Sequence, residues 1–206
     1  MKLLLASDIH SNIRNFKKIV ERESFDVLLI SGDLTNFRKS DVFSIDEILS
    51  KLGVECYAVH GNCDYEEILR YDLQSVRFIH GKSVKVDDVT IHGLGGSLPT
   101  PFETPSEYPE QYFSKLLDNF KISEFNVLLS HSPARGILDR TKHGVNVGSE
   151  EIAKRIPSFE VAVTGHVHEC YGVHKKETIV VNPGPVAWGL YAVLELKSLN
   201  VEMRRI

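Results

Sequence analysis

The sequence has few cysteines, and they do not form a disulfide framework. Cys56, Cys63 and Cys170 are the only three in the chain, an odd number without the paired spacing of a zinc finger. Proteins that depend on disulfides carry more cysteines and occur in oxidising compartments. We therefore expect a protein of the reducing cytoplasm.

Long hydrophobic runs and an excess of positive charge are also absent. No stretch approaches the roughly 20 apolar residues of a membrane-spanning helix. Asp8 and His10 interrupt the opening run MKLLLASDIH before it reaches the roughly 7–15 apolar residues of a signal peptide, so we interpret it as a buried strand. The net charge is −4, whereas a broad nucleic-acid or membrane surface needs many Lys and Arg contacts. A small anionic substrate remains compatible with this charge.

The chain of 206 residues, 42% apolar and 25% charged, suits one soluble domain, which we predict to span residues 1–206. Short β-branched runs alternate with helical patterns early on, and hairpin-like strands follow. This order predicts an α/β fold with a mixed sheet or two packed sheets flanked by helices. The predicted strands are 2–7, 26–31, 54–59, 83–94 (a hairpin), 125–130, 161–165, 178–182, 190–196 and 200–205; the predicted helices are 12–22, 41–52, 65–70, 109–120 and 149–156.

Polar clusters follow five of these apolar strands. In parallel-type α/β sheets the carboxyl ends of the strands line one crevice, and ligands bind there. The clusters are therefore expected to meet in a single site. They contain Asp8 and His10, then Asp33, then Asn62 with Cys63 and Asp64, then His131, and finally His166 with His168.

The spacing within the clusters favours metal binding. Residues two apart in an extended segment point to the same side, so Asp8 and His10 can face one ion. His166 and His168 lie roughly 6–7 Å apart along a strand, which suits two ions about 3.5–4 Å apart. Glycines precede several of the candidate ligands and permit sharp turns and close backbone approach; these are Gly32, Gly61 and Gly165.

The series D-x-H, GD, GN, H and GHxH between residues 8 and 168 resembles the calcineurin-like metallophosphoesterase superfamily. NPGP at 182–185 is similar to an Asn-Pro-Gly segment of many members, and HGVNVGSEEI at 143–152 is similar to a helix start in one small bacterial and archaeal branch. The resemblance implies a four-layer α/β fold, in which two mixed β-sheets pack as a sandwich with helices outside.

The resemblance also implies roles for seven residues. Asp8, His10 and His168 would hold one metal ion, Asn62, His131 and His166 would hold a second, and Asp33 would bridge the two. Asn62 and His131 would also lie near the phosphate oxygens. A mixed set of carboxylate, amide and imidazole ligands suits divalent transition metals, with manganese expected and iron, zinc or cobalt as alternatives.

The implied reaction is hydrolysis of a phosphate ester by in-line attack of a hydroxide that bridges the two ions. Two divalent ions bring about +4, which the carboxylates of Asp8 and Asp33, a hydroxide and a diester monoanion reduce to about zero. We therefore expect a phosphodiesterase acting on a small, possibly nucleotide-like, phosphate ester. The sequence carries no signal for oligomeric state.

Cys63 departs from the family pattern. Many members carry a histidine there, which is proposed to protonate the leaving group together with the following acidic residue. A thiol with a pKa of ~8.5 is a weaker acid than an imidazolium at ~6.5. We interpret Cys63 as a small buried thiol, with a zinc-binding thiolate as the alternative, and Asp64 as a turn brace or the remnant of the acid pair. His60 and His92 are alternative proton donors, although a hydrogen-bonding structural role competes for each.

The segment LPTPFETPSEYPE holds four of the eight prolines, and it predicts either a variable surface loop or a substrate rim. A second function stays open alongside catalysis. Because the acid at Cys63 is missing, the chain could be a non-catalytic protein-binding scaffold on the same fold, with the aromatic loop at 99–113 as its contact surface. Retention of all seven ligand positions favours the enzyme.

Overall fold

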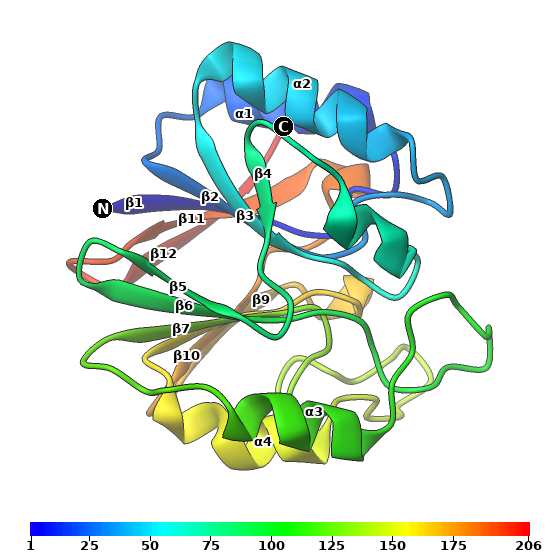
Figure 1. Cartoon of the computed structure of the whole chain (residues 1–206). Coiled ribbons are helices and arrows are strands. Elements are labelled where there is room, and N and C mark those ends of the chain that lie inside the picture. The colour runs from blue at the N-terminus through cyan, green and yellow to red at the C-terminus, as the bar shows by residue number, and fades with distance from the viewer.

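Two mixed six-stranded β-sheets pack face to face, with helices on their outer faces (Figure 1). The computed structural model describes residues 1–206. The strand order is β12-β11-β1-β2-β3-β4 in one sheet and β5-β6-β7-β8-β10-β9 in the other. The four-layer α/β fold implied by the sequence is therefore confirmed.

The first sheet joins the two ends of the chain. Four neighbouring strands pair in parallel: β1 (Lys2–Ala6), β2 (Val27–Ser31), β3 (Glu55–Val59) and β4 (Val76–Phe78). The strand β11 (Leu190–Glu195) pairs antiparallel with both β1 and β12 (Asn200–Arg205). The helices α1 (Ile13–Arg22) and α2 (Asp41–Leu52) cover its outer face in Figure 1, and the 3-10 helix η1 (Glu66–Arg70) follows β3.

The second sheet comes from the middle of the chain. Its strands are β5 (Ser83–Val86), β6 (Val89–Leu94), β7 (Asn126–Ser130), β8 (Val161–Val163), β9 (Gly172–Lys175) and β10 (Ile179–Asn182). The helices α3 (Glu110–Asp118) and α4 (Glu150–Arg155) cover it, and three short 3-10 helices complete the chain: η2 (Ile156–Ser158), η3 (His168–Cys170) and η4 (Val186–Trp188).

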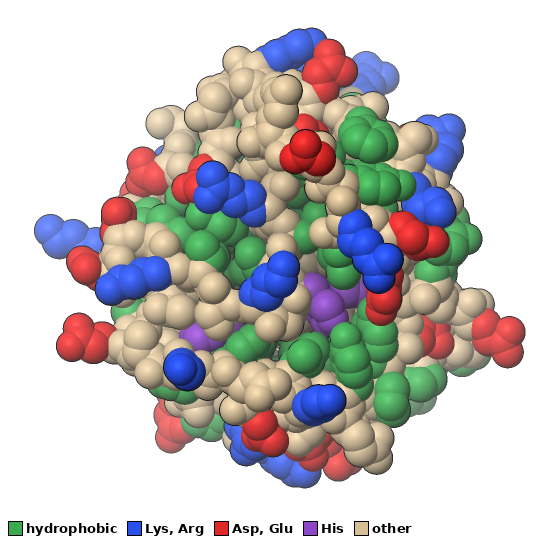
Figure 2. Space-filling model, in the orientation of Figure 1, with side chains coloured by type: hydrophobic (Ala, Val, Ile, Leu, Met, Phe, Trp, Pro, Cys, Tyr) green, Lys and Arg blue, Asp and Glu red, His purple; other side chains and the backbone are tan.

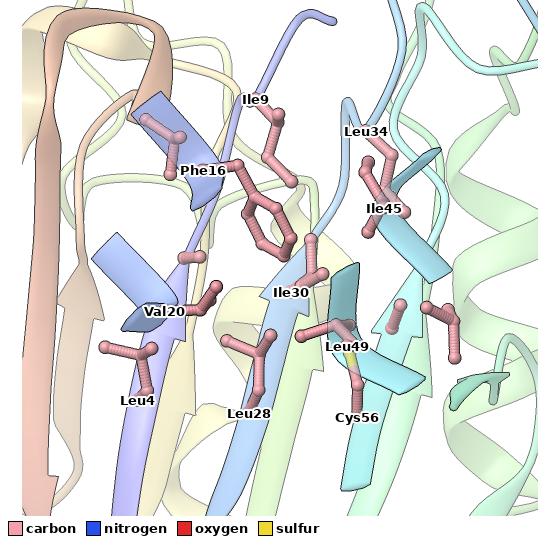
Figure 3. Packing of buried hydrophobic residues seen from close by; sticks show 14 of the residues in the cluster. Leu4, Ile9, Phe16, Val20, Leu28, Ile30, Leu34, Ile45, Leu49 and Cys56 are labelled. Atoms are coloured by element: carbon pink, nitrogen blue, oxygen red, sulfur yellow. The ribbon is translucent and has the colours of Figure 1, made fainter. Parts of the chain in front are cut away.

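Alternation along the strands divides the buried side chains between two layers. In β1, Leu4 packs with the layer under α1 and α2, whereas Leu3 and Leu5 pack between the sheets. Figure 3 shows Phe16 and Val20 of α1 above this first layer. Strands buried on both faces need continuous apolar sequence, which is why β1 and β2 have near-continuous apolar runs.

The predicted long helices and central strands are confirmed to within about two residues. Two differences arise where the sequence signal is short. Residues 66–70 form a 3-10 helix, and the strands β4 and β9, of three and four residues, were not predicted. Both strands lie at sheet edges and carry partly exposed polar residues, so no apolar run marks them. No helix has the length and apolar character needed to cross a membrane.

Candidate metal centre

Asp8, His10 and His168 form one group of side chains beyond the ends of β1 and β8. His168 Nε2 lies 3.2 Å from Asp8 Oδ1 and 3.1 Å from His10 Nε2. The potential ligand atoms of the three residues all lie within 4.8 Å of one another. One carboxylate and two imidazoles at this spacing could hold a transition-metal ion.

Asn62, His131 and His166 form a second group, which comes from the segments after β3, β7 and β8. Asn62 Oδ1 lies 2.9 Å from His131 Nε2 and 2.8 Å from His166 Nδ1. All three side chains are buried or partly buried. Three segments far apart in the sequence therefore bring one oxygen and two ring nitrogens together.

Asp33 lies between the two groups. Its Oδ2 is 3.6 Å from His10 Nε2 and 3.7 Å from His131 Nε2, and its Oδ1 accepts a hydrogen bond of 2.8 Å from the backbone N–H of Cys63. All seven residues singled out from the sequence thus lie in one cluster, with the carboxylate of Asp33 facing both groups.

Backbone strain is concentrated in this cluster. Ten non-glycine residues have positive φ, a conformation that costs such residues about 1–3 kcal/mol each and persists where the surroundings enforce it, often at functional sites. Four of the ten belong to the cluster: Asp8 at 51°, His10 at 46°, Asp33 at 50° and His166 at 69°. Four of the seven residues marked by the motifs are therefore strained.

The glycines beside the cluster leave no room for a side chain. A Cβ at Gly61 would lie 2.0 Å from Asp33 Oδ1, and one at Gly165 would lie 2.0 Å from Ser7 Oγ. Gly32 combines a φ of +93° with a clash at 2.4 Å against a histidine ring nitrogen of the cluster. The close backbone approach predicted for these three glycines is confirmed.

Replacing Gly61 with alanine is therefore expected to displace Asp33 and lower the rate of ester hydrolysis by about 100-fold, because a shift of about 1 Å in a catalytic group can cost this much. Gly53→Ala is the control, since Gly53 has a φ of +65° but nothing within 4 Å. We expect it to lower the free energy of unfolding by about 1 kcal/mol with unchanged activity. Equal activity of the two variants would contradict the close packing at Gly61.

The hydrogen bonds of His131 determine which of its ring nitrogens carries the proton. His131 Nδ1 lies 2.8 Å from the carbonyl oxygen of Ser31, and a carbonyl only accepts, so Nδ1 carries the hydrogen in the neutral ring. The Nε2 lone pair is then directed at Asn62 Oδ1, 2.9 Å away. Backbone bonds of this kind orient the histidines of metal sites.

The amide of Asn62 is oriented by Thr104. The Asn62 Nδ2 group donates to Thr104 Oγ1 at 3.0 Å, and Thr104 Oγ1 donates its own hydrogen to Glu107. Burial raises the pKa of Glu107, but hydrogen bonds from Thr100 and Thr104 outweigh it and lower that pKa below its ordinary value, so the carboxylate only accepts. The hydroxyl of Thr104 must then accept from Nδ2, which leaves Asn62 Oδ1 facing the histidines.

When the His131 ring is neutral, two acceptors face each other. Asn62 Oδ1 and His131 Nε2 then both present lone pairs at 2.9 Å, a contact that is repulsive unless a proton or a metal ion lies against both atoms. The donor set fits a metal ion for this reason, in addition to the types of residue present. Thr104 has no motif around it, and sequence analysis missed it.

Replacing Thr104 with valine is expected to free the Asn62 amide. We expect Mn²⁺ to bind roughly 10- to 100-fold more weakly at the site that contains Asn62, which is the usual cost of losing an outer partner of a ligand. Calorimetric titration of metal-stripped protein measures this change. Thr104→Ser keeps the hydroxyl and should restore the affinity. Unchanged Mn²⁺ affinity in the valine variant would show that the hydroxyl does not orient the amide.

Charge in the cluster is balanced between the acids and the histidines. Burial raises the pKa of Asp8, but the hydrogen bond from His168 and the positive charge that the neighbouring histidines carry when they are protonated outweigh it and lower that pKa below its ordinary value. Burial lowers the pKa of His168, and the hydrogen bond and charge of Asp8 more than offset this and raise it. Asp8 is therefore ionised at neutral pH.

A cleft opens over the cluster and is lined by several of its residues, among them His10, Asp33 and Asn62. Cys63 also lines this cleft and is only partly buried. This corrects the interpretation of Cys63 as a buried thiol. Its backbone N–H bonds to Asp33 Oδ1, and its Sγ, the Asp33 carboxylate and a ring nitrogen of His10 lie within 4.8 Å of one another. Burial, followed by the charge of Asp33, raises the pKa of the Cys63 thiol well above its ordinary value.

Asp64 braces the turn that carries Asn62. Its carboxylate accepts hydrogen bonds from the backbone N–H groups of Leu34, Thr35 and Gly61 and from the hydroxyl of Thr35, at 2.8–3.0 Å. Burial, and after it the charge of Asp33, raises the pKa of Asp64 to about 6 against the effect of these bonds. The turn-brace interpretation fits this geometry.

His60 and His92 do not line the cleft. His60 is fully buried and bonds to the Tyr108 hydroxyl at 2.9 Å; burial, and then the charge of His80, lowers its pKa well below the ordinary value. His92 is buried against Phe120, with ring centroids 5.0 Å apart. Both histidines therefore lie in packed surroundings and outside the lining of the cleft.

A family model describing the calcineurin-like phosphoesterase superfamily domain matches residues 1–198. The chain belongs to this superfamily. An uncharacterized protein of Methanocaldococcus jannaschii is 35% identical over 93% of this chain and 91% of its own length. Family membership and the donor cluster together support a metal-dependent phosphoesterase.

Solved structures agree with the fold. A protein of Thermus thermophilus superposes with a TM-score of 0.75 at 18% identity, covering 99% of this chain and 98% of that one. The NAD nucleotidase of Haemophilus influenzae superposes with a TM-score of 0.52 at 14% identity, and the match spans 100% of this chain but 49% of the nucleotidase. At these identities the likeness concerns the fold alone.

Proposed function

We propose that the chain is a phosphodiesterase that uses two divalent metal ions. Asp8, His10 and His168 would hold one ion, Asn62, His131 and His166 the other, and Asp33 would contact both. The observation that carries the proposal is the pair of facing lone pairs on Asn62 Oδ1 and His131 Nε2, 2.9 Å apart. When bound, the ions would lower the pKa of water and neutralise phosphoryl oxygens.

The protein side chains would position the ester and the ions. Asp33 would fix the distance between the two halves of the site, because its Oδ1 is tied to the backbone N–H of Cys63 and its Oδ2 is directed at the histidines. Asn62 and His131, each held by a bond on its far side, would be oriented towards the phosphate oxygens without reorganisation.

A singly charged diester would suit the site better than a doubly charged monoester. Asp8 and Asp33 are the two carboxylates of the cluster, and with two divalent ions and a hydroxide they leave a charge of about +1 for the substrate to balance. We propose a small, nucleotide-like ester as the substrate. Manganese is the metal we propose first, since the mixed ligand set suits it.

The proposal is tested by stripping the protein with a chelator and restoring Mn²⁺, then iron, zinc or cobalt. We expect bis(4-nitrophenyl) phosphate to be hydrolysed faster than 4-nitrophenyl phosphate, and the stripped protein to hydrolyse neither. A preference for the monoester would overturn the diester assignment, and no hydrolysis with any metal would overturn the enzyme.

Cys63→His should raise the turnover of diesters with poor leaving groups by roughly tenfold or more, and that of good leaving groups much less. An imidazolium at this position in the cleft could protonate a departing oxygen, whereas the thiol pKa is raised by burial and by Asp33. Cys63→Ala is the control, because it removes the thiol without adding an acid. Equal gains for both kinds of leaving group would count against missing proton donation.

A further inference from the structure

The cluster lies at the bottom of a cleft of about 490 Å³, a size typical of small-molecule sites. Five of the proposed ligands form its floor: His10, Asp33, Asn62, His166 and His168. The cleft is therefore continuous with the proposed metal centre, and whatever part of an ester extends away from the phosphate must occupy it.

Two loops form the walls, and most of their lining side chains are apolar, alongside Thr100, Thr141 and His143. One loop, green at the side of Figure 1, contributes Leu98, Pro99, Pro101 and Phe102, and the other contributes Val145 and Val147. Phe102 is 82% exposed and Val145 is 57% exposed. Figure 2 shows that hydrophobic and histidine side chains are exposed near the middle of the face viewed in Figure 1. Phe102 and Val145 belong to none of the hydrophobic core clusters.

The loop that carries Phe102 is closed at its base by a single carboxylate. Glu107 accepts hydrogen bonds from the backbone N–H groups of Thr100 and Thr104, at 3.0 Å and 2.9 Å, and from both hydroxyls. These two threonines flank the tip at 101–103. Phe102 is thus presented on a fixed support, which lowers the entropy lost when a ligand packs against it.

The walls also lack positive charge. None of the seventeen lining residues is Lys or Arg, and the carboxylates among them are Asp33 and Glu169. Sites that recognise a phosphate away from metal ions use Arg or Lys. A second phosphate or a carboxylate on the substrate would therefore find no Lys or Arg in the cleft, where His143 is the one histidine of the walls.

We propose that this cleft is a subsite for a flat, uncharged ring borne by an ester with a single phosphate, and that Phe102 and Val145 contact the ring. The inference rests on the proposed function for the placement of the phosphate. Beyond the proposed function, the ring subsite implies that an aryl or heteroaromatic group on the ester determines specificity. It also implies that nucleoside polyphosphates and acidic phosphopeptides are not substrates.

Calorimetric binding to Mn²⁺-reconstituted protein tests the subsite without relying on turnover. We expect phenylphosphonate to bind at least about tenfold more tightly than methylphosphonate, because the ring removes apolar surface from water. A carboxylate on the ring, as in 4-carboxyphenylphosphonate, should abolish that gain. In Phe102→Ala the ratio of the first two dissociation constants should fall to within about twofold of one. Phe43→Ala is the control. It removes another exposed phenylalanine, which stacks on Tyr71 outside the cleft, and it should leave the ratio unchanged.

The outcomes separate the two proposals. Equal binding of phenylphosphonate and methylphosphonate by the wild-type protein would overturn the ring subsite, while metal-dependent hydrolysis of aryl diesters would still stand. If the ratio of the two dissociation constants is unchanged in the double variant Phe102→Ala, Val145→Ala, the assignment of the ring to these walls would likewise be overturned. Binding of neither phosphonate to the metal-loaded protein would overturn the subsite together with the proposed phosphate position.

Discussion

Replacing Asp33 with asparagine is expected to lower kcat for bis(4-nitrophenyl) phosphate by roughly 1000-fold or more. Loss of an outer partner of a ligand already costs about 10- to 100-fold in metal affinity or activity, and the Asp33 carboxylate lies close to a histidine of each group, at 3.6 Å from His10 Nε2 and 3.7 Å from His131 Nε2. An amide has one oxygen and no negative charge, so it cannot serve both ions.

Kinetics at saturating Mn²⁺ measure this effect, and metal content per chain shows whether one ion is lost with it. Asp88→Asn is the matched control, because Asp88 lies exposed in the hairpin between β5 and β6. Thermal unfolding of the metal-free variants excludes a general folding defect. Full activity of Asp33→Asn with a normal metal content would contradict the site assignment.

Asp64→Asn is expected to destabilise the protein by about 3 kcal/mol or more. The carboxylate accepts four hydrogen bonds from Leu34, Thr35 and Gly61. Asparagine supplies one oxygen, and its NH₂ group would face N–H donors, which leaves buried donors unpaired at about 1–3 kcal/mol each. Urea unfolding of the metal-free protein measures the loss.

Asp46→Asn makes the comparison informative. Asp46 also accepts backbone N–H bonds, from Gln74, Ser75 and Val76 at 2.8–2.9 Å, but it braces the start of β4 rather than the metal centre. Both variants should lose stability, and only Asp64→Asn should also lose activity at temperatures where both are folded, because it moves the turn that holds Asn62. Activity loss of equal size in both would show that Asp64 acts through stability alone.

The sequence predicts most of the fold and the membership of the cluster. Polar residues after buried strands mark the site because parallel strands end at one edge of a sheet. What the sequence does not reveal depends on contacts between distant segments. Thr104 orients Asn62 through a hydrogen bond across 42 positions, and no local pattern marks it. The direction of the Cys63 side chain depends likewise on the bond between its backbone and Asp33.

The proline-rich loop shows the same limit. Composition alone left it as a surface loop or a substrate rim, and the structure places Leu98, Pro99, Pro101 and Phe102 on the wall of the cleft. Glu107 fixes this placement by accepting hydrogen bonds from the backbone N–H groups of Thr100 and Thr104. The N–H of Ser106 adds to it by donating to the carbonyl oxygen of Asn62. These bonds could not be inferred from a sequence in which Glu and Thr are ordinary surface residues.

The central claim is a two-metal centre, and calorimetric titration of the metal-stripped protein with Mn²⁺, paired with diester hydrolysis at each step, tests it most directly. We expect two ions to bind per chain, with hydrolysis increasing as the second site fills. Binding of two ions without turnover would instead favour a protein-binding scaffold. Absence of metal binding, or full activity in the stripped protein, would contradict the two-metal centre.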